Sequence, residues 1–66
     1  MKTFNIHFDD DNDSNDKGFK ESFQYCIDYI QMHNGSNTSY FKDYKGGTVS
    51  IVCNETGESV YHTAVK

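Results

Sequence analysis

The most regular hydrophobic pattern in the chain lies between residues 19 and 34. Apolar side chains recur there at the spacing that places them on one face of an α-helix, which buries that face in a core. These positions are Phe19, Phe23, Cys26, Ile27 and Ile30. Asn34-Gly35 follows, and a glycine there commonly ends a helix in the left-handed conformation. We therefore predict one helix over 19–34, with Asp16 or Ser14 as its N-terminal cap.

Other segments are typical of β-strands. Residues 3–8 alternate strictly, with Phe4, Ile6 and Phe8 on one face. Residues 48–53 are rich in β-branched side chains, and 59–65 complete a hairpin whose turn places Gly57 in the left-handed region. Residues 39–45 alternate more loosely and are aromatic, so we predict a strand there, joined to 48–53 by a tight turn at 46–47.

The resulting order, β-α-β-β-β, predicts a two-layer α+β domain over residues 1–66. One helix would pack on a four-stranded, mostly antiparallel sheet. The helix would connect the first strand to the rest of the sheet as a crossover. The first strand would therefore lie parallel to its neighbour, either the second or the last strand. In the last hairpin, Val52 would face Val60 and Ile51 would face Tyr61. Both sheet faces would then be partly apolar, and a second copy or a partner would cover one face or the aromatic edge strand.

Length and composition narrow the function classes. A chain of 66 residues with ten aromatic side chains can build one small core, with no room left for a deep substrate pocket. Cys26 and Cys53 each lie in an apolar run, where a free cysteine behaves as a buried hydrophobe. No secretory signal or bilayer-spanning segment is apparent. We expect a cytoplasmic location, free thiols and no membrane association.

The net charge of −4 comes from one segment. Residues 9–16 carry five Asp and no base, whereas the other residues hold six Lys against five acids, which gives +1. The body of the domain is therefore close to neutral. Because binding to nucleic-acid phosphates needs a basic face, this distribution argues against nucleic acid as a partner.

The acidic loop 9–16 and the residues after it resemble the spacing of calcium ligands in an EF-hand loop. Hard oxygen ligands fall at positions 1, 3, 5, 7 and 12, which are Asp10, Asn12, Ser14, Asp16 and Glu21. The turn glycine of the motif is replaced by Asn15, a lysine stands at position 8, and a strand comes before the loop. These departures favour a solvated acidic loop that caps the helix, with calcium binding as the alternative.

A second feature is a stripe of Tyr25, Tyr29 and Met32, which a helix would turn away from the core stripe. Exposed tyrosine and methionine are typical of protein contacts. Tyr40 and Tyr44 of the predicted aromatic strand extend the same partner-binding surface. The alternative is that these side chains pack as the outer fringe of the core.

No catalytic arrangement is apparent. His7, His33 and His62 are isolated, no spacing supplies further ligands for a metal, and no nucleophile has a local base. Lysines lie among Tyr40, Phe41 and Tyr44, where aromatic rings on a sheet could stack single-stranded bases. We predict a non-catalytic, regulatory or accessory interaction module that binds a protein or self-associates as a homodimer. The alternatives are a calcium-binding domain without another cofactor and a single-stranded nucleic-acid binder.

Overall fold

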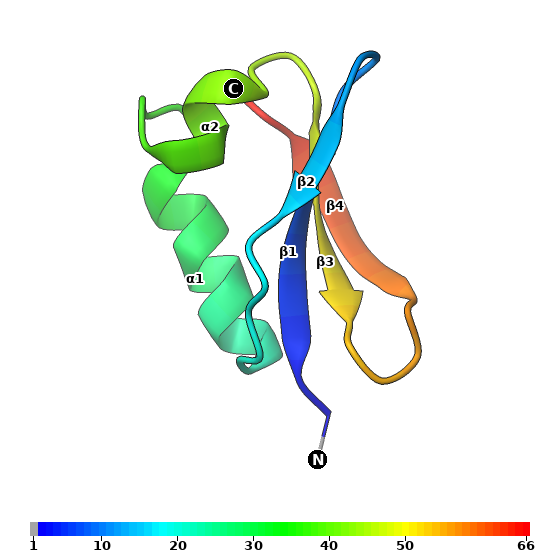
Figure 1. Cartoon of the computed structure of the whole chain (residues 1–66). Coiled ribbons are helices and arrows are strands. Elements are labelled where there is room, and N and C mark those ends of the chain that lie inside the picture. Colours follow the sequence, from blue (N-terminus) through cyan, green and yellow to red (C-terminus); the bar gives the residue numbers. More distant parts are fainter. Residues whose placement is uncertain (1) are drawn as a thin grey trace.

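Residues 2–66, which the computed structural model describes, form four strands and two helices (Figure 1). The elements are β1 (Phe4–Asp9), β2 (Ser14–Asp16), α1 (Phe23–His33), α2 (Ser39–Asp43), β3 (Thr48–Cys53) and β4 (Ser59–Ala64). The strands form one open sheet in the order β2-β1-β3-β4, and every pair is antiparallel. The predicted α+β class is confirmed, but the element order is β-β-α-α-β-β. Within the described residues, no helix is long and apolar enough to span a membrane.

The acidic segment 9–16 is a hairpin turn followed by a strand, where the sequence predicted a loop. The Asp10 N–H donates to the Asp13 carbonyl at 2.9 Å. The Asp10 carboxylate accepts hydrogen bonds from the N–H groups of Asn12 and Asp13, both at 2.8 Å. Asp and Asn side chains favour turns because they bond to the nearby backbone in this way. The chain then runs back along β1, with His7 opposite Asp16.

This hairpin reverses the direction expected for the rest of the sheet. Because β2 returns the chain toward the start of β1, Glu21 pairs with Phe4 through two backbone hydrogen bonds of 2.7 and 3.2 Å. Helix α1 then runs beside β1 toward the far end of the sheet, and β3 comes back (Figure 1). The prediction that the first strand is parallel to a neighbour is therefore wrong. Because β2 is inserted after β1, the chain changes direction once more before β3 than it would through a crossover helix alone. Strand β3 therefore runs antiparallel to β1.

Helix α1 begins later than predicted. Gly18 has φ of 72°, a left-handed conformation outside helical geometry, and Lys17 donates its N–H to the Ile6 carbonyl at 2.9 Å. Residues 17–21 are thus held along β1. Ser22 is the N-terminal cap, and its hydroxyl accepts from the Tyr25 N–H at 3.1 Å. Neither Asp16 nor Ser14 caps the helix, because both lie in β2.

The segment predicted as an aromatic strand forms the short helix α2 instead. Phe41 and Tyr44 lie three positions apart, so a helical turn brings both rings to the core side, whereas a strand would place them on opposite faces. Gly46-Gly47 consequently links α2 to β3 and is not a hairpin turn. The Gly46 N–H donates to the Val65 carbonyl at 3.0 Å, which ties this link to the end of β4.

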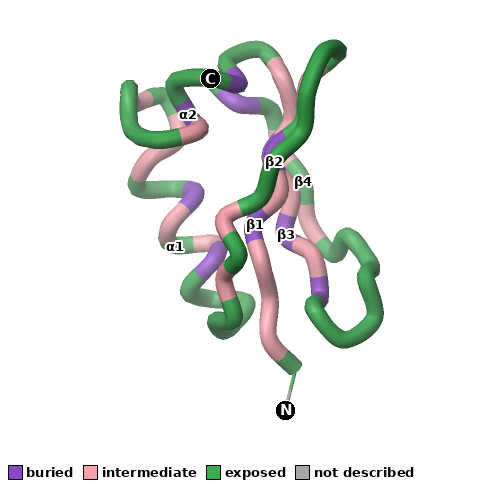
Figure 2. Tube along the Cα trace, in the orientation of Figure 1, coloured by how far each residue is buried: buried purple, intermediate pink, exposed green. Residues whose placement is uncertain are grey.

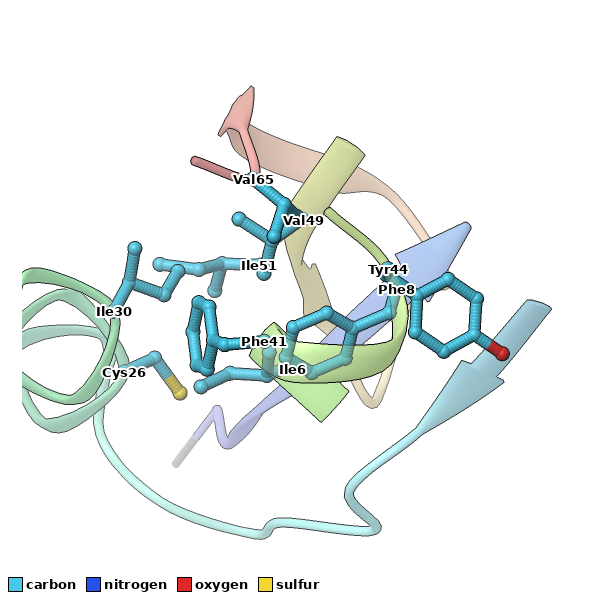
Figure 3. Packing of buried hydrophobic residues seen from close by; sticks show 9 residues of the cluster. All are labelled: Ile6, Phe8, Cys26, Ile30, Phe41, Tyr44, Val49, Ile51 and Val65. Atoms are coloured by element: carbon cyan, nitrogen blue, oxygen red, sulfur yellow. The ribbon is translucent and has the colours of Figure 1, made fainter. Parts of the chain in front are cut away.

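The core lies between one face of the sheet and the two helices. Figure 2 shows buried residues on β1, β3 and the inner side of α1, whereas β2 is exposed throughout. Figure 3 shows side chains from both layers meeting in this core. Its members are Ile6, Phe8, Cys26, Ile30, Phe41, Tyr44, Val49, Ile51 and Val65. Phe19, Ile27 and Phe4 pack at its margin, and Phe23 is 38% exposed.

The opposite sheet face is polar, which corrects the expectation of apolar pairs on both faces. Ile51 faces Tyr61 as predicted, but a bulge shifts the register so that Val52 pairs with Ser59 and Val60 has no direct partner. A bulge inserts one extra residue into a strand. The side chains that alternate with the core positions of the central strands are mostly polar: Asn5, His7, Asp9, Thr48, Ser50 and Val52.

Candidate interaction surface on helix α1

The outer face of α1 carries the tyrosine and methionine stripe. Met32 is 75% exposed and Tyr25 is 46% exposed, whereas Tyr29 is half-buried against the core. Together with Asp28 and His33, these three side chains line a surface hollow of about 270 Å³. We call this set of five residues the α1 surface. The structure thus brings together the three stripe residues that the sequence singled out.

Ring contacts hold the tyrosines of the α1 surface in place. The Phe19 ring packs edge-on against Tyr25 and Tyr29, with centroid distances of 5.7 and 5.2 Å. The rings of Tyr29 and His33 are 4.5 Å apart. Edge-on aromatic pairs are favourable beyond the area they bury. Side chains already fixed in this way lose little conformational freedom when a partner binds.

Lys17 connects Tyr40 to the α1 surface. Its ammonium group lies 5.2 Å from the Tyr40 ring centroid, 5.9 Å from that of Tyr29 and 6.0 Å from that of Phe19. It also donates a hydrogen bond to the Ser39 hydroxyl at 2.9 Å. A cation among aromatic faces is attracted by each ring quadrupole. Nothing in the sequence indicates this role, because Lys17 becomes a neighbour of Ser39 and Tyr40 only in the folded chain.

Tyr44 lies in the core and cannot contribute to an exposed surface. It is 4% exposed and its ring packs 5.8 Å from that of Phe8. Burial raises the pKa of its hydroxyl, and the nearby Asp13 carboxylate raises the pKa further. Tyr40, in contrast, is half-buried at the margin of the core. The base-stacking surface predicted from Tyr40, Phe41 and Tyr44 therefore lacks two of its three rings, because Phe41 and Tyr44 are buried.

This position of Tyr44 predicts a loss of stability in alkali. A raised pKa in the folded state favours the neutral hydroxyl, so this contribution to stability is complete below the ordinary value of 10.0. It is lost as the pH rises from there through the higher pKa of the folded protein. Urea unfolding of the wild type and Tyr44→Phe at a series of pH values will measure it. The stability of the wild type should fall more steeply above pH 10 than that of the variant, and parallel curves would contradict the prediction.

The five residues predicted to bind calcium are not brought together. Asp10 follows the last residue of β1, whereas Glu21 pairs with Phe4 at its first residue. A strand of this length separates them by roughly 15 Å. Ser14 and Asp16 lie in β2, and the Asp10 carboxylate bonds to the turn backbone. Within residues 2–66, no group of three or more His, Cys, Asp or Glu side chains could hold a metal ion.

The histidines and cysteines are also separated. His7 and His62 each lie opposite Ser50, on the strands flanking β3, so their Cα atoms are about 10 Å apart across two strand spacings. His33 belongs to the α1 surface. Cys26 and Cys53 are free and buried. Burial raises the pKa of the Cys26 thiol, whereas hydrogen bonding with Thr56 lowers that of Cys53.

No protein-family model matches the chain, and no curated protein or solved structure shows significant similarity to it.

Proposed function

We propose that this protein is a non-catalytic interaction module that binds a larger protein through the α1 surface. The observation that carries the proposal is the exposure of Met32 and Tyr25 around one hollow on helix α1. Aromatic and methionine side chains are enriched at protein interfaces. The fixed rings of Tyr25 and Tyr29 supply contact area at a small entropic cost.

The shape of the hollow favours a polypeptide partner over a small molecule. It is an open depression on the outer face of one helix, whereas small-molecule sites are clefts or cavities that bury most of the ligand. It suits one apolar side chain inserted from a partner segment. Met32 and the tyrosine rings would contact that side chain. The methionine is flexible and adapts to the shape of a partner, whereas the tyrosine rings are rigid.

The charge of the α1 surface indicates which type of residue should lie beside the apolar anchor of the partner segment. Helix α1 contains Asp28 and neither Lys nor Arg. The Asp28 carboxylate accepts a hydrogen bond from Gln24 at 2.9 Å and borders the hollow. A partner segment with Leu, Met or Phe next to Lys or Arg would complement the surface in both shape and charge.

A random peptide library displayed on phage tests this proposal. Selection on the immobilised protein should enrich peptides that combine an apolar anchor with an adjacent basic residue. Met32→Ala and Tyr25→Ala should each weaken binding of an enriched peptide by roughly fivefold or more, because truncating a central contact commonly costs over 1 kcal/mol. Asp28→Asn should weaken binding and reduce its dependence on salt. Fluorescence anisotropy of the labelled peptide measures all three.

Gln31→Ala is the matched control, because Gln31 is an exposed residue of the same helix outside the α1 surface. It should leave the affinity unchanged. Unfolding curves of all variants should overlap with the wild type, since none of these side chains is buried. The proposal fails if no peptide is enriched, or if the enriched peptides bind the Met32 and Tyr25 variants as well as the wild type.

A further inference from the structure

The side chain of Asn34, the C-terminal cap of α1, fastens the end of the helix to the end of β4. Its amide nitrogen donates to the Ala64 carbonyl at 3.0 Å, and its amide oxygen accepts from the Lys66 N–H at 2.9 Å. Among residues 2–66, no other hydrogen bond joins α1 or its cap to residues 59–66. We call these two bonds the Asn34 clip. A hollow of about 230 Å³ lies beside the clip and opens it to water.

The residue that follows Asn34 makes this clip chemically vulnerable. Asn34 precedes Gly35, whereas each of the other five asparagines precedes a residue with a side chain. The backbone nitrogen after an asparagine can attack the carbon of the side-chain amide, and glycine leaves that nitrogen unhindered because it has no Cβ. The same asparagine therefore belongs to a reactive dipeptide and makes the contact between α1 and β4.

The reaction is a deamidation in two balanced steps. The Gly35 nitrogen loses its proton and bonds to the Cγ atom of Asn34, the Cγ–Nδ2 bond breaks, and the amide group leaves as ammonia. Water then opens the resulting succinimide ring. Attack at Cγ leaves an aspartate at position 34, and attack at the backbone carbonyl leaves an isoaspartate, whose main chain runs through the former side chain. Either product consumes one water, releases one ammonia and replaces a neutral amide with a carboxylate.

The folded structure holds Asn34 away from the reactive geometry. Ring closure needs the Gly35 nitrogen on the same side of the Cα–C bond as the Asn34 side chain, and at the observed ψ of 127° the nitrogen is turned away from it. Both polar atoms of the amide are also engaged in the clip. The ring therefore closes only after the clip opens and the backbone rotates, so the rate follows the population of this local opening.

We propose that Asn34-Gly35 is a site of spontaneous deamidation and that this modification breaks the Asn34 clip. A carboxylate only accepts hydrogen bonds, so it repels the Ala64 carbonyl to which the amide donates. It also places a negative charge at the C-terminal end of α1, where the helix dipole disfavours it. Because the amide is not regenerated, the clip does not form again. The proposal involves no contact of the α1 surface, so it can fail independently of the proposed partner binding.

Incubation of the purified protein in mildly alkaline buffer tests the site, because base removes the proton from the attacking nitrogen. Peptide mapping with detection of isoaspartate follows the conversion at each asparagine. Conversion at position 34 should be several-fold faster in guanidinium chloride than in native buffer, and in the denaturant it should exceed conversion at Asn37. No conversion at position 34 in the denaturant would overturn the site. Equal rates with and without denaturant would overturn its protection by the fold.

Lys66→Pro tests the clip without changing the reacting dipeptide. Proline removes the N–H that donates to the Asn34 side chain, and this N–H bonds to no other acceptor among the described residues. Native Lys66→Pro, with a circular dichroism spectrum like that of the wild type, should deamidate several-fold faster. Lys66→Ala keeps the N–H and is the matched control, which should react at the wild-type rate. Equal rates of the two variants would overturn the role of the clip.

Asn34→Asp reproduces one product and tests the structural consequence independently of the proline variant. The Val65 N–H donates to the Gly47 carbonyl at 3.0 Å. Its hydrogen exchange should become several-fold faster in Asn34→Asp, because the end of the strand is then held from one side only. Asn37→Asp adds the same charge at an exposed residue after α1 and should leave this exchange unchanged. Equal exchange at Val65 in Asn34→Asp and the wild type would overturn the proposed effect on the clip.

Discussion

Phe41→Ala is expected to leave much of the protein unfolded. The Phe41 side chain is fully buried, and its ring lies 4.9 Å from that of Phe8 and 6.1 Å from that of Tyr29. It therefore joins α2 to both β1 and α1. Removing a buried phenylalanine costs about 3–5 kcal/mol, whereas a core of this size supplies roughly 3–5 kcal/mol of net stability. Urea denaturation followed by circular dichroism should show the loss of the folded baseline.

Lys42→Ala is the control for this result. Lys42 is the next residue of α2 and is exposed, so its truncation tests the helix without the core contact. Its unfolding free energy should stay within about 0.5 kcal/mol of the wild type, as at most surface positions. A Phe41→Ala variant that loses less than about 1 kcal/mol would show that α2 does not belong to the cooperative core.

Gly47→Ala is the second substitution with a large expected effect. An added Cβ would clash with the carbonyl oxygen of Asp9 and would lie 3.1 Å from that of Tyr44. These two obstacles are backbone atoms, and the third, the Asp10 Cβ at 3.0 Å, is attached directly to the backbone, so no flexible side-chain end can move aside to make room. Asp9 pairs with Thr48 at this end of the sheet, and relief of the clash requires β1 and β3 to separate there. Overpacking of this kind costs about 1–3 kcal/mol or more.

Thermal unfolding together with amide chemical shifts will measure the effect of Gly47→Ala. The shifts should change most at Asp9, Thr48 and Val65, since Val65 donates its N–H to the Gly47 carbonyl at 3.0 Å. Lys45→Ala alters the same link at an exposed side chain and should leave both the stability and these shifts unchanged. Equal stability of Gly47→Ala and the wild type would contradict the close approach of the two strands.

The candidate surface was only partly predictable from the sequence. The spacing of Tyr25, Tyr29 and Met32 indicated one helical face, and all three line the same hollow. The contact of Lys17 with Tyr29 and Tyr40 could not be anticipated, because it depends on where α2 packs. The position of β4 at the edge of the sheet was equally hidden. Which strand lies at the edge depends on the order in which the strands pair. The hydrophobic pattern along the chain does not specify that order.

By itself, the sequence determined the features that depend on neighbouring residues. Hydrophobic periodicity specified β1, most of α1, β3 and β4, and the left-handed glycines at 35 and 57 adopt the conformations predicted from turn chemistry. Only the tertiary structure decided the features that depend on distant contacts. These are the helical state of 39–43, which brings Phe41 and Tyr44 into the core together, and the pairing of 14–16 with β1. Short segments have weak intrinsic preferences, so packing and strand pairing select their conformation.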